Sequence, residues 1–408
     1  MSRVFIPSTD QADNDLMLTA LSEGAAVQQA VLSTGLRVWA VTGYAEAKTA
    51  LLDTRLKKDP ATLSDPALLF DGGRHPEDSY AVLGRHVLNT DGADHRRLRE
   101  LLTKCLAPKA VDRRRRRIAE IVGTSLDTLA ASATPDLVTM FAGPVMTSVM
   151  SDVIGIEKNL LDRLLTAVRT VVAGADPQSA EAREAADAQQ RLILEAIDDH
   201  ERFPGTDTLL KLAFRDYHPN GRLSLAEVMS MVALTLFAGT TTSTTLLAHT
   251  AALASTRDDL LEAIMAGPAS CSAVLSEVMR RYPPTPCATW RFATEDVEVG
   301  GVTIPRDATV LVVVAAANRD PEAYPDADRL VVPRPGNTGH IGFGHGPHFC
   351  AGAPLALTTA TTALPALFAR FPQLSLAVPL EKLRWTTNLG DRSLFSVPVR
   401  LRPDERPA

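Results

Sequence analysis

The residues best suited to chemistry in this 408-residue chain surround Cys350. The segment 343–352 reads Phe-Gly-His-Gly-Pro-His-Phe-Cys-Ala-Gly, and a mostly apolar run with Pro354 near its start follows it. Proline is tolerated in the first turn of a helix, so this run predicts a helix with Cys350 at its N-terminus. The helix dipole and unpaired amides at such a position lower the pKa of a thiol and favour the thiolate. A thiolate held in a glycine-rich loop is a good soft ligand for iron.

This segment resembles the haem-binding loop of the cytochrome P450 superfamily. Six positions match that loop without a gap: Phe343, Gly344, Gly346, His348, Cys350 and Gly352. The resemblance implies that Cys350 binds the iron of haem b (iron protoporphyrin IX) as a thiolate, which favours O–O cleavage. It also implies that Phe343, His348 and Gly352 bind the cofactor, His348 through a propionate. The alternative for Cys350 alone is a buried structural cysteine, and a dinucleotide loop is rejected because the full GxGxxG spacing is absent.

Further cofactor contacts are predicted far from this loop. His95 and Arg99 are four residues apart and therefore share one face of the helix that opens near Asp91. Two such groups suit a ligand that carries carboxylates. The resemblance implies that His95 and Arg99 hold one haem propionate and that Arg291 holds the other. The alternative for the basic pair is a solvated helix face.

A long helix must carry the opposite side of the site. Ser224-x-x-Glu227 is a capping box that predicts its start. The sequence from Val228 is apolar almost all round, as in a buried helix. Continuation to Ala254 gives a length of roughly 45 Å. The resemblance implies that this central helix crosses over the haem.

The middle of this helix carries small and hydroxylated residues. Ala238 and Gly239 let a flat macrocycle lie close, and the resemblance makes them cofactor contacts. Thr242 matches the threonine that assists proton delivery, whereas Thr241 stands where the family has an aspartate or glutamate. Thr241 and Thr242 are thus the predicted catalytic residues, although threonine cannot ionise to relay protons. The alternative is that these hydroxyls only bond to helix carbonyls.

A structural network is predicted beneath the site. Glu277 and Arg280 are three residues apart on one helix face. The resemblance implies that they form a buried ion-pair network with Arg334. The polar hairpin tip 390–393 resembles a segment that enters the pocket, and it suggests either a polar substrate group or an exposed turn.

Composition limits the cellular setting. The net charge of −6 argues against a nucleic-acid partner, and four scattered cysteines fit a reducing cytosol. The N-terminus lacks a signal-peptide pattern, and we expect no stretch to approach the roughly 20 apolar residues of a membrane span. We therefore expect a cytoplasmic protein. The chain contains no flavin or iron–sulfur segment, so electrons are expected from a ferredoxin and its reductase, with the arginine run 113–117 as one candidate docking patch.

The predicted fold is mainly α with a smaller β part, the α+β cytochrome P450 fold, as one domain over residues 1–408. A helix-rich body covers about 90–282, and a sheet-rich part comes from about 1–62 and 285–402. We expect a strand at 35–41 and helices at 45–52, 118–129 and 135–161. We also expect a short helix at 206–217 capped by Thr206, an irregular segment at 64–87, and strands at 302–304 and 310–315. The resemblance implies that the segment 64–87 caps the substrate pocket and that 168–186 contains the hinge between two lid helices.

The predicted function is that of a haem-thiolate monooxygenase. It would hydroxylate or epoxidise a small organic molecule with O2, in secondary-metabolite biosynthesis, and a carrier protein is a possible partner. Because Thr241 replaces the usual acid, one alternative is oxidative coupling or rearrangement. A second alternative is a non-catalytic haem sensor or scaffold.

Overall fold

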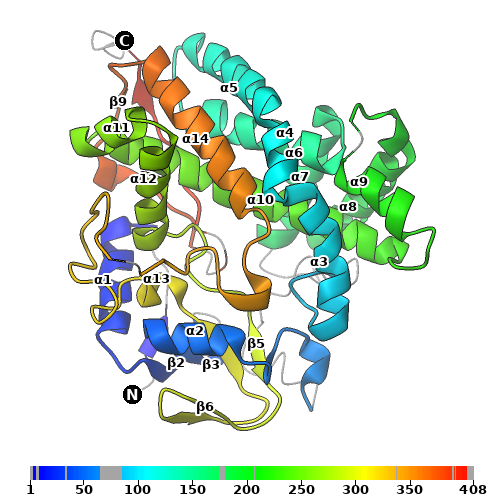
Figure 1. The fold of residues 1–408 in the computed structure, drawn as a ribbon, viewed down its shortest axis with the longest axis vertical. Helices are drawn as coiled ribbons and strands as arrows, with labels where there is room; N and C mark the ends of the chain where they lie inside the picture. The colour runs from blue at the N-terminus through cyan, green and yellow to red at the C-terminus, as the bar shows by residue number, and fades with distance from the viewer. Residues whose placement is uncertain are drawn as a thin grey trace.

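The computed structural model describes residues 3–5, 9–32, 35–64, 85–173, 180–205, 207–336, 338–387, 390 and 392–401. Helices dominate, and most of them gather in one part of the molecule with most of the strands below them, while a short strand near the C-terminus lies at the opposite end (Figure 1). The helices are α1 Gln11–Ser22, α2 Tyr44–Leu52, α3 Gly92–Leu106, α4 Pro108–Arg113, α5 Arg115–Ala130, α6 Gly143–Ile154, α7 Lys158–Ala173, α8 Ala180–Asp199, α9 Leu209–Leu212, α10 Leu225–Ala254, α11 Asp258–Met265, α12 Pro268–Arg281, α13 Val314–Ala317 and α14 Ala353–Arg370.

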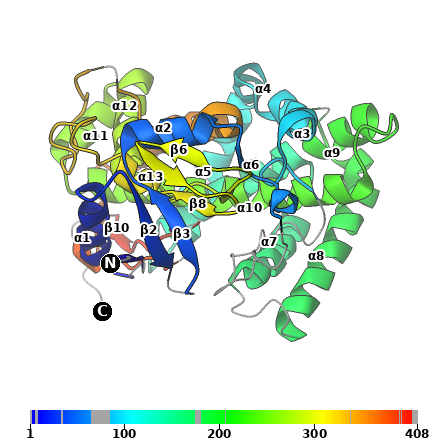
Figure 2. The same ribbon diagram turned by 90° about the horizontal axis from the view of Figure 1, so that it is seen from below.

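The strands draw on both ends of the chain. They are β1 Arg3–Phe5, β2 Val27–Leu32, β3 Arg37–Val41, β4 Leu56–Lys57, β5 Arg291–Ala293, β6 Val297–Val299, β7 Val302–Ile304, β8 Thr309–Val312, β9 Ser375–Leu376 and β10 Val399–Arg400. The main sheet has the order β1-β2-β3-β8-β5-β4, and β6–β7 and β9–β10 form separate pairs. Strand β8 pairs in parallel with β3 and antiparallel with β5. This pairing joins residues near the start of the chain to residues after position 290, and it fixes the position of Arg291 in the sheet. Figure 2 shows this sheet on the opposite side of the molecule from α7 and α8.

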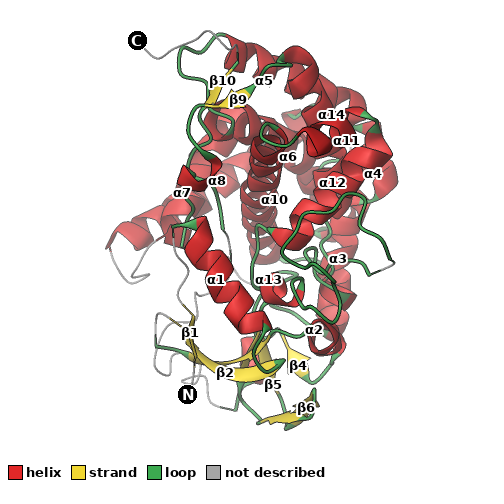
Figure 3. Cartoon of the chain, turned by 90° about the vertical axis from the view of Figure 1, so that its left-hand side faces the viewer, coloured by secondary structure: helices red, strands yellow, loops and turns green. Residues whose placement is uncertain are grey.

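Helix α10 runs through the centre of the helical body (Figure 3). Its start is confirmed: the Ser224 hydroxyl accepts from the backbone N–H of Glu227, and the Glu227 carboxylate accepts from the N–H of Ser224. Its end at Ala254 is also as predicted. The helix packs against α6, α12 and α14. Its apolar side chains are therefore covered by other helices on several sides.

One composition-based expectation is wrong for this helix. Helix α10 has the length and apolarity of a membrane span, with a mean hydropathy of 1.4 over its most apolar 18 residues. Of that 18-residue stretch, 61% is buried inside the protein. A helix that is apolar all round occurs in the core of a large globular protein as well as in a membrane. Its place at the centre of the body accounts for its composition.

Several other boundaries differ from the predictions. The predicted helix 135–161 is broken, because Gly155 adopts φ 89° and ends α6 before α7 begins. Thr206 lies outside the described residues, and Thr208 is the residue that caps α9. The predicted strand 310–315 ends at Val312 and is followed by the short helix α13. Most of the segment 64–87 and the centre of the predicted hinge lie outside the described residues.

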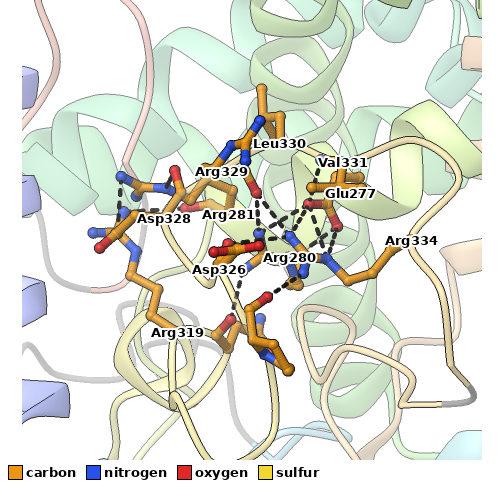
Figure 4. A network of polar contacts seen from close by, with 12 residues as sticks. Glu277, Arg280, Arg281, Arg319, Asp326, Asp328, Arg329, Leu330, Val331 and Arg334 are labelled. Atoms are coloured by element: carbon orange, nitrogen blue, oxygen red, sulfur yellow. Dashed lines mark hydrogen bonds and ion pairs between the residues drawn. The ribbon is translucent and has the colours of Figure 1, made fainter.

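The predicted network around Glu277 is present (Figure 4). The Glu277 carboxylate accepts two bonds of 2.9 Å from Arg280 and one of 2.7 Å from Arg334. Arg280 also donates to the carbonyls of Asn318 and Arg329. Glu277 and Arg280 are 5% and 2% exposed, so this carboxylate neutralises two cations out of contact with water. The network ties α12 to the segment that leads to the Cys350 loop.

A second network fastens α1 to the same region. Asp15 accepts bonds from Arg281 at 3.1 Å and from Arg319 at 2.7 Å. Burial raises the pKa of Asp15, but the two guanidiniums outweigh it, so its pKa lies below the ordinary value of 3.8. The contribution of Asp15 to stability is therefore present above that value and is lost as the pH falls through the lower folded pKa.

We expect Asp15→Asn to lower the free energy of unfolding at pH 7 by about 1–3 kcal/mol, because the buried Arg319 and Arg281 lose the carboxylate that they share. Among the described residues, only Arg281 keeps a second carboxylate, that of Asp328 at 3.3 Å. The difference from the native protein should shrink below pH 4 and vanish once the native carboxyl is protonated. Urea unfolding measured from pH 7 to pH 3 checks this. A difference that stays constant over that range would contradict the assignment.

Candidate functional site

The loop before α14 is closed by backbone hydrogen bonds. The Cys350 N–H donates to the Phe343 carbonyl at 2.8 Å, and the Gly344 N–H donates to the Ile341 carbonyl at 2.8 Å. Gly344 and Gly346 have φ of 77° and 74°, a region that favours glycine. A Cβ on Gly346 would also lie 2.8 Å from a Leu52 methyl of α2. The glycines therefore allow a tight loop that packs against α2 and presents Cys350 at its end.

Cys350 differs from the other three cysteines. Cys105, Cys271 and Cys287 are buried, whereas Cys350 has exposed surface. Burial raises the pKa of these three thiols to about 12, 11 and 12 respectively. They are inert core side chains.

The predicted lowering of the Cys350 thiol pKa is wrong for the protein alone. The surrounding protein still desolvates the Cys350 thiolate and raises the pKa above its ordinary value, while the N–H groups of Gly352 and Ala353 and the charge of Arg99 act in the opposite direction. The helix N-terminus therefore contributes as predicted, but desolvation outweighs it in the protein alone. A bound cation removes this obstacle because a coordinating thiol is deprotonated outright.

Two histidines from distant segments meet beside this loop. The rings of His95, on α3, and His348 have centroids 4.1 Å apart. Burial lowers the pKa of His95 to about 4 and also lowers that of His348, so both rings are neutral hydrogen-bonding groups at neutral pH. Within the described part of the chain, His95 Nε2 and His348 Nδ1 are enclosed and have no hydrogen-bond partner. Buried polar atoms are usually paired, so these two indicate a ligand with polar atoms.

Two arginines complete the cluster. Arg291 is 3% exposed, and its guanidinium reaches only the carbonyls of Thr289 at 3.4 Å and Leu51 at 3.5 Å. Burial lowers its pKa to about 10. Arg99 is half-buried, and burial lowers its pKa as well. Burying a guanidinium without a close anion is costly, so both side chains favour an anionic ligand.

These residues fit the haem that the sequence predicts. Two unpaired imidazole nitrogens and two weakly paired guanidiniums suit a pair of carboxylates, which are acceptors only. An exposed thiol with amides directed at its sulfur suits a soft metal ion. The structure thus brings together His95, Arg99, Arg291, His348 and Cys350, with Phe343 and Gly352 in the same loop.

The middle of α10 has an exposed strip. Residues 228–237 and 245–254 are buried, but Ala238 is exposed, and Gly239 and residues 241–244 are partly exposed. This strip coincides with the predicted distal residues. The described contacts link neither Thr241 nor Thr242 to the cluster around Cys350, so their roles there remain predictions.

The threonine hydroxyls in the middle of α10 differ in their hydrogen bonds. Thr242 donates to the Ala238 carbonyl at 2.7 Å, and Thr240 donates to the Leu236 carbonyl at 2.8 Å. The Thr241 hydroxyl is enclosed and has no partner among the described residues. Gly239 has a packing reason to be small, because a Cβ there would lie 2.6 Å from Met150 Sδ of α6. Its predicted contact with the cofactor is an additional, untested role.

The arginine run 113–117 is already paired. Arg113 bonds to Asp207 at 2.8 Å, and Arg117 bonds to Asp152 at 2.9 Å. The three arginines between them also have nearby partners: Arg114 with the Asp207 carbonyl, Arg115 with Asp112, and Arg116 with Glu120. A groove of about 420 Å³ lies instead on α3. It is lined by Pro347 of the Cys350 loop, by the basic residues Arg96, Arg99 and Lys104, and by Glu100 among others.

The hairpin tip is not a simple exposed turn where it is described. Arg392 is 7% exposed, stacks over the Trp385 ring at 4.6 Å and donates to Gln11 at 2.9 Å. Burial lowers its pKa to about 10. Asp391 lies outside the described residues. The contacts of Arg392 hold the tip against α1 and so give this arginine a structural role.

Sequence reasoning missed two residues of the cluster, Asp91 and Lys58. Asp91 Oδ2 accepts from the N–H groups of Lys58 at 2.8 Å and Asp59 at 3.0 Å, and its Oδ1 lies 3.9 Å from His348 Nε2. Burial opposes ionisation of Asp91, but the nearby His348 ring and the N–H groups of Lys58 and Asp59 lower its pKa to about 2. Lys58 is 3% exposed. Lys58 follows another lysine at the end of β4, a pattern that does not distinguish it from a surface lysine.

Known families and proteins resemble this chain. The cytochrome P450 family model matches residues 271–383. Cytochrome P450 107B1 of Saccharopolyspora erythraea is 36% identical, covering 92% of this chain and 92% of that protein. The 6-deoxyerythronolide B hydroxylase of the same organism is 36% identical, covering 90% of this chain and 91% of that protein.

Solved structures show the same fold. The tirandamycin C-bound P450 monooxygenase TamI has a TM-score of 0.85 and 31% identity, covering 98% of this chain and 100% of that chain. CYP154C4 from Streptomyces sp. W2061 has a TM-score of 0.86 and 30% identity, covering 98% of both chains. The helix-rich body and small sheets of the present chain therefore match this fold over nearly their whole length.

Proposed function

This chain belongs to the cytochrome P450 family, and on that premise we propose that it uses haem b to hydroxylate or epoxidise a secondary metabolite. As a member of the family it is a haem-iron monooxygenase that acts on a small molecule with O2 and redox partners. The observation that best supports the proposed site is the pair of unpaired nitrogens, His95 Nε2 and His348 Nδ1, in the cluster that contains Cys350.

We propose specific roles for the residues of this cluster. His95 and His348 donate N–H bonds to the haem propionates, and Arg99 and Arg291 neutralise them. Cys350 is the thiolate ligand, and bound haem supplies oxygen activation. The amides of Gly352 and Ala353 stabilise the negative charge on the sulfur, which tunes its electron donation.

On the opposite side, the small residues Ala238 and Gly239 leave space on α10. Thr242 holds its hydroxyl through the Ala238 carbonyl, and its oxygen remains able to accept another bond. We propose that it positions a water for proton delivery to the reacting oxygen. Thr241 has an enclosed hydroxyl without a described partner, and we propose that it holds a second water in this path.

The proposed substrates are secondary metabolites of the polyketide class. Relatives include PikC of Streptomyces venezuelae at 33% identity and the mycinamicin IV hydroxylase/epoxidase of Micromonospora griseorubida at 32%. The test is turnover of a macrolactone panel under labelled O2 with a surrogate ferredoxin and reductase. We expect one labelled oxygen atom in the product. Oxidised products that never carry the label would contradict the monooxygenase proposal for this site.

We propose a ferredoxin as the electron donor. The α3 groove beside Pro347 is lined by Arg96, Arg99 and Lys104 and by one acid, Glu100, which pairs with Lys104 at 3.7 Å. Its lining is basic on balance, which suits an acidic protein surface. This groove is preferred to the arginine run 113–117, whose side chains are engaged by nearby acids and carbonyls. We further propose that the enzyme works in the cytoplasm, with a free or carrier-tethered substrate.

A second candidate function is oxidative coupling or rearrangement. The supporting observation is Thr241, which cannot ionise where the family has an acid. A structural neighbour, CxnD, is described as forming a C–S bond, at 26% identity and a TM-score of 0.86. Unlabelled, oxidised products from labelled O2 would favour this candidate over oxygen insertion.

The two threonines give a prediction about coupling, the product formed per pair of electrons used. We expect Thr241→Asp to raise coupling, because a carboxylate can relay protons. We expect Thr242→Val to lower it by roughly tenfold or more, because positioned proton-transfer groups contribute up to about 10²–10⁴-fold. NADPH consumption and product are measured together, with Thr250→Val as a buried control on the same helix. Equal coupling in all four proteins would contradict both roles.

A further inference from the structure

The side chain of Asn318 is a buried polar group to which no role has been given. Asn318 caps the C-terminal end of α13 and is 0% exposed. Its backbone is held on both sides, because its N–H donates to the Val314 carbonyl at 2.9 Å and its carbonyl accepts from Arg280 at 2.8 Å. The side chain therefore extends from a fixed position beside the network of Glu277 and Arg280 (Figure 4).

The Asn318 side chain reaches the segment that leads into the Cys350 loop. Its Oδ1 accepts from the Ile341 N–H at 2.9 Å, and this bond is buried. Ile341 belongs to no helix or strand, so no ladder of backbone bonds holds it. Its side chain packs in the same hydrophobic cluster as Val314 and Ala317, but apolar packing is non-directional. The hydrogen bond from Asn318 therefore orients the backbone at Ile341.

The hydrogen bonds that close the loop begin at the same residue. The Ile341 carbonyl accepts from the Gly344 N–H at 2.8 Å, and the Phe343 carbonyl accepts from the Cys350 N–H at 2.8 Å. A series of contacts thus runs from Asn318 through Ile341 to the loop that presents the sulfur.

Only the acceptor half of the Asn318 amide is used. Its Nδ2 is enclosed and has no hydrogen-bond partner among the described residues. An unpaired buried donor costs stability, so packing alone does not account for an asparagine at this position. The Ile341 N–H does require an acceptor, because Ile341 is 2% exposed and water cannot serve instead.

We propose that Asn318 is a positioning residue for the Cys350 thiolate, and that its Oδ1 holds the loop so that the sulfur stays on the iron. This inference rests on the proposed haem site. Asn318 acts through Ile341 and the backbone bonds of the loop, rather than by contact with the reacting atoms.

The test measures how long sulfur ligation lasts in the haem-loaded, reduced protein under carbon monoxide. Decay of the red-shifted Soret band is followed in the native chain, Asn318→Ala, Asn318→Ser and Asn318→Asp. Alanine removes the acceptor and serine is too short to reach the Ile341 N–H, whereas aspartate keeps an acceptor oxygen at the same reach.

Two further variants serve as controls. Tyr324→Phe removes a hydrogen bond of 3.0 Å to the Gly339 carbonyl, two residues before Ile341, where Tyr44 also donates. Leu161→Ala destabilises the core through a residue that is 0% exposed on α7, a helix that packs against α6, α8 and α10. The first tests any lost bond to this segment, and the second tests general loss of stability.

We expect Asn318→Ala and Asn318→Ser to speed the decay of the band by roughly tenfold, the scale of one hydrogen bond lost by a buried group. Asn318→Asp and Tyr324→Phe should decay at the native rate. Leu161→Ala should lower the free energy of unfolding in urea and leave the decay rate unchanged.

A native decay rate in Asn318→Ser or Asn318→Ala would overturn the proposal. Equal acceleration in these variants and in Leu161→Ala would also overturn it, because Asn318 would then contribute only stability. A native chain without the red-shifted band would instead contradict the proposed haem site itself.

Discussion

Replacement of Cys350 by serine is expected to abolish oxygen insertion while the protein still folds. Serine keeps the size and the loop hydrogen bond from the residue 350 N–H to Phe343, but an alcohol is not a thiolate at neutral pH. The electron donation that favours O–O cleavage is then lost. Changes to residues that only hydrogen-bond to a metal ligand lower activity by roughly 10–100-fold. Because Cys350 is proposed as the ligand itself, we expect labelled product to decrease by more than that.

Haem retention separates this effect from simple loss of the cofactor. The groups around His95 and His348 remain in Cys350→Ser, so part of the haem should stay bound, and activity is expressed per bound haem. Cys287→Ser is a control at a buried thiol that the account assigns to packing. Full activity per haem in Cys350→Ser would remove Cys350 from the proposed mechanism.

Replacement of Glu277 by glutamine is expected to be strongly destabilising although it is a conservative change. The shape is kept, but Arg280 and Arg334 lose the carboxylate that both of them share. Breaking a buried ion pair by neutralising one partner costs about 3–5 kcal/mol, because a buried charge is left uncompensated. We therefore expect a loss of this size in the free energy of unfolding at pH 7.

The control for this change is an exposed ion pair. Asp162 bonds to Lys158 at 2.6 Å one helical turn away, and about half of each side chain is exposed. We expect Asp162→Asn to cost only about 0.3–0.5 kcal/mol. Denaturant unfolding of both haem-loaded variants gives the comparison. Similar losses in the two variants would show that the Glu277 network does not carry the predicted stability.

Local sequence patterns predicted the parts of the site that depend on short-range chemistry. The capping box at Ser224 and Glu227 was enough to place the start of α10, because both partners lie within one turn. The spacing of Glu277 and Arg280 likewise predicted a contact that forms within one helix. The glycines and proline around Cys350 predicted a tight loop followed by a helix, and both are present.

Features that depend on distant packing were not predictable in this way. Gly239 faces Met150, from a different helix, so the sequence could not separate a packing role from a cofactor role. Lys58 meets Asp91 and Thr289 only after three segments have come together. The pKa of Cys350 depends on how much protein surrounds the sulfur, and a motif does not contain that information.

The most direct test of the account is the absorption spectrum of the purified, haem-loaded protein after reduction and addition of carbon monoxide. If Cys350 is the thiolate ligand, the native chain gives the red-shifted Soret band of a sulfur-ligated haem, and Cys350→Ser does not. A native spectrum without that band, or the same band in Cys350→Ser, would contradict the central claim.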